Sequence, residues 1–141
     1  RAYGFLGMLE AVFLMLVFFV YLYLMGYSYG DIITTDSNLY ITATSLALTS
    51  IVFSQIGTGF AVRSNYSSIF KIGFFTNKFY LYGILYETVL LTLILHVPFL
   101  NKMFGTVGFD FYLLIYLLPI PFVLLFMEEL RKMVVRKMKN I

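Results

Sequence analysis

Four long apolar stretches constrain this chain more than any other feature of its sequence. A helix needs about 20 mostly apolar residues to cross a bilayer, and each stretch approaches or exceeds that length. The second contains no charged residue, and the first and third each contain a single glutamate. We therefore expect an all-α integral membrane protein with four transmembrane helices, forming one domain over residues 1–141. The predicted spans are residues 3–25, 39–62, 79–97 and 109–127.

The composition excludes the alternatives to a membrane protein. Of the 141 residues, 61% are hydrophobic and 12% are charged, whereas a soluble domain carries about 25% charged residues. So little charge excludes a soluble enzyme, a nucleic-acid-binding module and a disordered chain. A membrane β-barrel is excluded too, because its strands are only about 10 residues long. Tyrosines near the ends of the stretches, Tyr80 among them, are typical of an interfacial belt; the alternative for each is ordinary packing.

The basic residues predict the orientation in the membrane. Nine of the ten lysines and arginines lie at the N-terminus, between the second and third stretches, or after residue 127; the exception is Lys102. Because basic residues accumulate on the cytoplasmic side, we expect both termini to be cytoplasmic. Glu128 and Glu129 precede basic residues at helical spacing, which predicts a short, basic, helical tail over residues 128–141.

Gln55 is the first candidate for function inside a stretch. Its amide oxygen suits a hard cation or a partner in a proton relay. Thr58 lies on the same side of a helix, less than one turn away. The alternative is ordinary hydrogen bonding between helices, which glutamine and threonine also provide.

Two glutamates form the second group of candidates. Glu87 falls near the middle of the third stretch, where a carboxyl group must be protonated, paired or in contact with water. It is either a proton or cation ligand, or a protonated acid bonded to a neighbouring helix. For Glu10, nearer a span end, we expect a structural role with a basic partner such as Arg1 or Arg63.

Glycine and proline predict local features of the helices. Gly57 and Gly59 lie within about one turn of Gln55, which favours close approach of another helix; the alternative is a helix loosened beside a site. Pro98 is expected to end the third helix, because proline lacks a backbone donor. The pair Pro119 and Pro121 predicts a kink inside the fourth stretch.

The sequence contains no motif for catalysis. It has no GxxxxGK[ST] phosphate-binding loop, no Ser/His/Asp set and no cysteine, so we expect no catalysis and no cofactor from this chain alone. It begins with Arg1 rather than methionine, so we expect a fragment or a trimmed chain.

Several segments, taken in order, resemble one known family. They are RAYGFLGMLE at the start, VFSQIGTGFAVRS around Gln55, FFTNK before the third stretch, HVPFLNKMFGT after it, and MEELRK near the end. Gln55, Arg63 and Ser64 fit a Q-x-x-N-x-x-N-x-R-S pattern, and Asn77 and Lys78 fit an N-K/R pair. Together these segments resemble the seventh to tenth membrane helices of P-type cation-transporting ATPases, in the branch of the calcium and sodium pumps.

The resemblance implies a role in an ATP-driven cation pump. In that family Mg-ATP phosphorylates an aspartate in a cytoplasmic domain, and the fourth to sixth helices supply most cation ligands. This chain would scaffold those helices, with the transported cation, the rest of the ATPase and the lipid bilayer as partners. Gln55 stands where calcium pumps have a ligand glutamate. The implied location is the cell membrane.

The chain also departs from the family pattern. Thr58 and Ala61 stand where asparagine is common, and Glu87 where an uncharged residue is expected. The alternative interpretation is a free-standing four-helix membrane protein, an accessory subunit or a small channel, with Glu87 and Gln55 lining a polar path.

Overall fold

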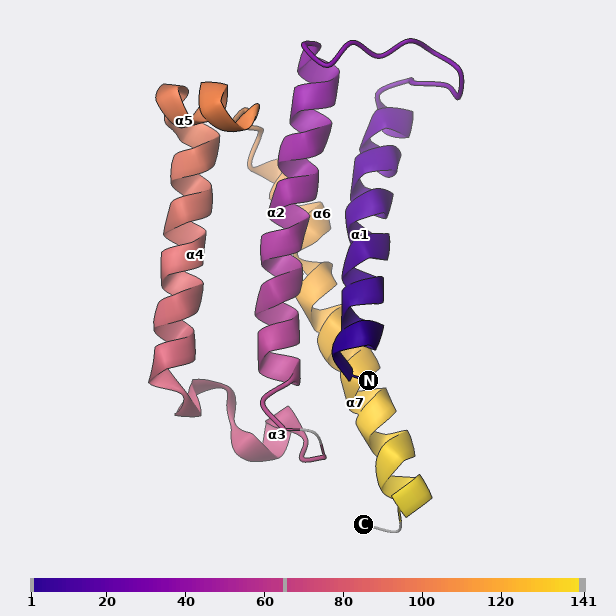
Figure 1. Ribbon diagram of the computed structural model, residues 1–141, viewed down its shortest axis with the longest axis vertical. Helices are drawn as coiled ribbons and strands as arrows, with labels where there is room; N and C mark the ends of the chain where they lie inside the picture. Colours follow the sequence, from indigo (N-terminus) through magenta and orange to yellow (C-terminus); the bar gives the residue numbers. More distant parts are fainter. Residues whose placement is uncertain (1, 65, 140–141) are drawn as a thin grey trace.

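The computed structural model describes residues 2–64 and 66–139, and these residues form helices and no strand. Four helices are long and three are short, with one 3₁₀ turn (Figure 1). In chain order they are α1 (Ala2–Leu24), α2 (Asn38–Ala61), α3 (Ile69–Ile72), η1 (Phe74–Thr76), α4 (Lys78–His96), α5 (Pro98–Phe104), α6 (Tyr112–Leu117) and α7 (Pro119–Lys139).

The long helices run up and down in an antiparallel bundle. α1 begins and α7 ends at the same end of the bundle, where the connection with α3 also lies (Figure 1). Within the described residues, four helical segments are long and apolar enough to cross a membrane: α1, α2, α4 and the α6–α7 segment from Tyr112 to Met138. The predicted all-α class with four membrane helices is confirmed. Which end faces the cytoplasm, and the single-domain assignment, remain predictions.

Local sequence chemistry fixes several helix ends. Ser37 caps α2 by accepting the Tyr40 backbone N–H at 3.3 Å, and Asn77 caps α4 by accepting the Tyr80 N–H at 3.1 Å. Such caps satisfy backbone donors that have no partner within the helix. As predicted, α4 stops just before Pro98, which begins α5 instead.

The fourth stretch differs in detail from its prediction. The helix begins at Tyr112, not at residue 109. It is also divided, since α6 ends and α7 begins on either side of Leu118. This break precedes Pro119, as the missing proline donors require. Beyond the apolar part α7 continues without interruption to Lys139, so the basic tail extends the same helix.

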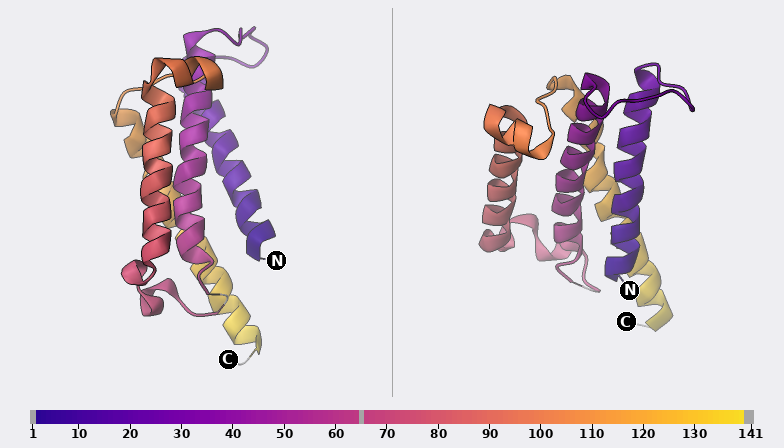
Figure 2. Two further views of the ribbon diagram at one scale, coloured as in Figure 1. Left: turned by 60° about the vertical axis from the view of Figure 1, so that its left-hand side comes forward. Right: turned by 45° about the horizontal axis from the view of Figure 1, so that its top comes forward.

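α2 is the central helix of the bundle. It stands between α4 and α1 in every view (Figure 2) and also packs along α7. A Cβ atom on Gly57 would lie 2.7 Å from both Cα and O of Pro121, so the backbones of α2 and α7 meet there. A Cβ on Gly59 would overlap the ring of Tyr80 from α4. The prediction that both glycines permit close packing is confirmed.

Candidate functional site

Gln55 lies on an open face of α2. Its side chain is exposed and makes no hydrogen bond within the described part of the chain. Gly57, which faces α7, is about 160° away around the helix at 3.6 residues per turn. Gln55 therefore opens on the side opposite α7, between α1 and α4.

Glu87 and Gln55 lie between the same two contacts of α4 with α2. Two contacts join α2 to α4: the Tyr80 hydroxyl meets the Ile56 carbonyl, and Leu91 packs in a cluster with Val52. Gln55 lies between residues 52 and 56 of α2, and Glu87 lies between residues 80 and 91 of α4. Since the helices are antiparallel (Figure 1), the same two contacts bracket both side chains.

Gln55 and Glu87 also share one side of the α2–α4 pair. At 3.6 residues per turn, Gln55 is rotated about 60° from Val52, and Glu87 about 40° from Leu91, in the same sense along the chain. In antiparallel helices, equal senses of rotation from the contact line point to one side. Glu87 is half-buried and, like Gln55, has no hydrogen bond to the side chain among residues 2–64 and 66–139. We call this region, Gln55 and Glu87, the open face.

Glu10 and Thr58 meet each other directly. The Thr58 hydroxyl donates a 2.5 Å hydrogen bond to Oε1 of Glu10, joining α2 to α1. Arg63 is not the basic partner expected for Glu10, and Arg1, the other candidate, lies outside the described residues. Arg63 instead donates to the carbonyls of Gly73 and Phe74, at 2.9 and 3.3 Å. Those carbonyls lie beyond the end of α3 and hold the guanidinium at the bundle end.

A second polar region joins α7 to the connection after α2. Lys132 is fully buried, and its Nζ donates to Ala61 O at 2.8 Å and Ser67 O at 3.3 Å. Its third partner is Glu129 Oε1, at 3.3 Å, which also accepts the Ile69 N–H at 3.1 Å. The cation thereby lies at the C-terminal end of α2, where helix carbonyls lack intrahelical partners.

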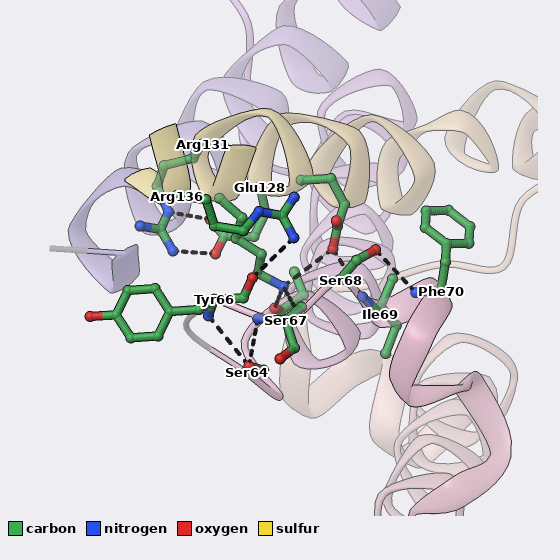
Figure 3. A network of polar contacts seen from close by, with 12 residues as sticks. Ser64, Tyr66, Ser67, Ser68, Ile69, Phe70, Glu128, Arg131 and Arg136 are labelled. Carbon is green, nitrogen blue, oxygen red and sulfur yellow. Dashed lines mark hydrogen bonds and ion pairs between the residues drawn. The ribbon is translucent and has the colours of Figure 1, made fainter. Parts of the chain in front are cut away.

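Two more pairs complete this region. Glu128 is 1% exposed and accepts two hydrogen bonds from Arg131, at 2.6 and 2.7 Å. Arg136 donates to Tyr66 O at 3.2 Å. Figure 3 shows these α7 side chains facing the segment from Ser64 to Phe70. The helical spacing predicted the pairs within α7, but not their contact with that segment. We call Glu128, Glu129, Arg131, Lys132 and Arg136 the α7 junction.

The sequence assigned Tyr80 to an interfacial belt or to ordinary packing, and not to a site. In the structure its hydroxyl donates to the Ile56 carbonyl at 2.7 Å and lies 3.4 Å from that of Gln55. The signal in the sequence was Gly59, whose missing side chain allows the ring to approach. Over the described ranges, no three His, Cys, Asp or Glu side chains group together as a metal site.

This fold defines a class: a multi-pass helical membrane domain with polar groups between its helices. A family described as "Cation transporting ATPase, C-terminus" matches residues 1–134. The chain belongs to this family of cation-transporting ATPase C-terminal domains. This confirms the resemblance and the multi-pass membrane assignment, and it does not favour a free-standing accessory subunit or channel.

Similar proteins agree with the family. The chain is 31% identical over 102 residues to "Calcium-transporting ATPase 1" of Saccharomyces cerevisiae, covering 72% of this chain and 11% of that protein. Proteins with the same name from Bacillus cereus and Yarrowia lipolytica are 34% and 36% identical over 70 and 63 residues. These matches cover 50% and 45% of this chain, and 8% and 7% of the relatives. The matched segment is thus about a tenth of each relative's length.

Proposed function

We propose that this chain is the C-terminal membrane part of an ATP-driven cation pump, and that its open face contributes ligands to the cation path. The observation that carries the proposal is the position of Gln55. It is a polar side chain on the central helix, exposed on the side opposite α7 and without a partner within the described residues. In a membrane protein such a group marks a contact with a ligand or with other helices.

The scaffold part of the proposal rests on the packing of α2. The Gly57–Pro121 contact and the buried Lys132 fix α2 against α7. The face of α2 between α1 and α4 has no such cover. We infer that the helices carrying most of the cation ligands pack against this face in the complete ATPase.

The ligand part rests on the pairing of Gln55 with Glu87. Gln55 supplies a neutral amide oxygen where the resemblance implies a glutamate, so it lacks the charge that a cation favours. Glu87 lies between the same two α2–α4 contacts and on the same side, and supplies a carboxylate. A carboxylate between membrane helices is costly unless it is protonated or paired, and a bound cation or proton provides that compensation.

The energy for transport would come from outside this chain. We propose that Mg-ATP binds the cytoplasmic domains of the parent ATPase, with the α7 tail and the α2–α4 connection on the cytoplasmic side.

An immunoblot of source membranes with an antibody to residues 128–138 tests whether this chain is part of a larger ATPase. We expect a band several times heavier than the 16.3 kDa of this chain. A band near 16 kDa would contradict the proposal.

Two substitutions in the full-length ATPase test the ligands. Gln55→Ala and Glu87→Gln should each raise the cation concentration for half-maximal ATPase activity about tenfold, which corresponds to one lost ligand worth about 1.4 kcal/mol. The assay uses calcium, sodium, magnesium and pH titrations in parallel, because the cation is part of the question. Tyr86→Phe is the control, since Tyr86 is 70% exposed beside Glu87. Unchanged activation curves for every cation would refute the ligand role.

A further inference from the structure

One hydrogen bond ties α4 to the backbone of α2 beside Gln55. The Tyr80 hydroxyl donates to the Ile56 carbonyl at 2.7 Å, with the Gln55 carbonyl 3.4 Å away. Both carbonyls belong to the backbone of α2. The hydroxyl therefore links α4 to the turn of α2 that carries the Gln55 side chain. The bond joins two helices far apart in the sequence.

The ring of Tyr80 packs closely against α2. Gly59 lies beneath it, and a Cβ atom there would overlap the phenol. The Phe60 ring meets it edge to face, with centroids 4.9 Å apart at 84°. Phe60 in turn contacts Phe74 at 5.4 Å. Such edge-to-face contacts are favourable for aromatic rings, so the ring is held on α2 by more than its hydroxyl.

The same residue determines where Glu87 lies. Tyr80 and Glu87 are seven residues apart on α4, which is almost two turns and about 10 Å along the helix. The two side chains therefore leave α4 on nearly the same side. Anchoring Tyr80 to the carbonyl of residue 56 fixes the height of Glu87 relative to Gln55. Outside this region α4 packs on α2 through the few apolar residues around Val52, Leu91 and Leu95.

We propose that Tyr80 is a positioning residue for the cation path, setting the axial offset between Gln55 and Glu87. This inference rests on the proposed function of those two residues. Cation ligands must be held within a fraction of an ångström of their working geometry. A shift of α4 along α2 would change the distance between the amide oxygen and the carboxylate, and with it cation affinity and selectivity.

Tyr80→Phe in the full-length ATPase tests the inference, because it removes the hydroxyl and keeps the ring against α2. We expect the cation concentration for half-maximal activity to rise about three- to tenfold. The turnover per phosphorylatable enzyme should stay within about twofold. Tyr82→Phe is the matched control, since Tyr82 lies on the same helix and is 66% exposed; it should change neither quantity.

A double variant separates positioning from general packing. If Tyr80 acts through Gln55, the Tyr80→Phe substitution should weaken cation activation less in the Gln55→Ala variant than in the wild-type ATPase. Gly59→Ala, which displaces the ring, should shift activation in the same direction as Tyr80→Phe.

Each remaining outcome overturns a defined claim. If Gln55→Ala weakens activation and Tyr80→Phe does not, the positioning role is wrong and the proposed function stands. Equal effects of Tyr80→Phe in both backgrounds, or a fall in turnover and yield with unchanged affinity, would also overturn positioning. If Gln55→Ala and Glu87→Gln have no effect, the proposed ligand role fails and the positioning role fails with it.

Discussion

The α7 junction and the open face treat their polar groups in opposite ways. At the junction, Lys132 is fully buried and has three partners, and Glu128 is held by two hydrogen bonds from Arg131. At the open face, neither the Gln55 nor the Glu87 side chain forms a hydrogen bond or an ion pair within the described residues. Both regions interrupt an apolar chain with polar residues.

The difference separates folding from function. A buried charge whose partners all lie in the same chain holds two of its segments together, and its loss leaves those partners unpaired. A polar group that lacks partners in its own chain is expected to contact a ligand or helices outside that chain. The two regions therefore make opposite predictions for stability, which can be tested in the detergent-solubilised protein.

Removing the buried lysine should have the largest effect. Lys132→Met keeps an unbranched side chain but deletes the donor to Ala61 O, Ser67 O and Glu129. Because breaking a buried pair costs roughly 3–5 kcal/mol, we expect the free energy of unfolding to fall by about 3 kcal/mol. Titration with sodium dodecyl sulfate in mixed micelles measures it.

Lys137 provides the control for this change. It lies on the same helix, but its side chain is exposed, and exposed charges contribute little to stability. Lys137→Met should therefore leave the unfolding curve nearly unchanged. Equal losses for the two lysines would mean that the α7 junction does not stabilise the fold.

The contact between α2 and α7 should give the next largest effect. Gly57→Ala places a Cβ atom 2.7 Å from the Pro121 backbone, which cannot move as a flexible side chain can. Overpacking of this kind costs roughly 1–3 kcal/mol, so we expect a loss of about 2 kcal/mol. Gly83→Ala on α4 meets no atom within 4 Å and should lose nothing. A tolerated Gly57→Ala would show that the two helices are not in backbone contact.

The sequence predicted the helices because hydropathy and punctuation residues act locally. The apolar stretches gave the four long helices, and Pro98 and Pro119 marked breaks that the structure contains. The short α3 and α5 were not predicted. They are four and seven residues long, which is too short to stand out in a hydropathy pattern that detects membrane spans.

The site was less predictable, because partners depend on packing. Hydropathy identified Gln55, Thr58, Glu10 and Glu87 as polar interruptions, but it could not tell which two would meet. Thr58 satisfies Glu10 across α1 and α2, a choice set by how those helices cross. The contact of Tyr80 could not be predicted from the sequence for the same reason, since its partner is a backbone carbonyl and not a side chain. The ligand roles remain predictions.

The comparison between polar groups with and without partners can also be tested within α2, at a buried hydroxyl. Ser54 is 1% exposed and its Oγ has no hydrogen-bond partner among the described residues. An unsatisfied buried group carries its desolvation cost, so Ser54→Ala should raise the free energy of unfolding by about 1 kcal/mol. Ser50→Ala should lower it, because Ser50 Oγ donates to Ala47 O at 2.7 Å. Losses for both variants would mean that the Ser54 hydroxyl forms a hydrogen bond in the folded protein, as Ser50 does.

The smallest effect on stability is expected at the open face. Gln55→Leu removes an exposed side chain without a partner, so the free energy of unfolding should change by less than about 0.5 kcal/mol. Thr58→Val, less than one turn away, deletes the bond to Glu10 and should cost about 1 kcal/mol. In the full-length ATPase the order should reverse if Gln55 is the ligand, with Gln55→Leu shifting cation activation more than Thr58→Val. A large loss of stability with Gln55→Leu would instead make Gln55 a structural residue, and the contrast between the two regions would disappear.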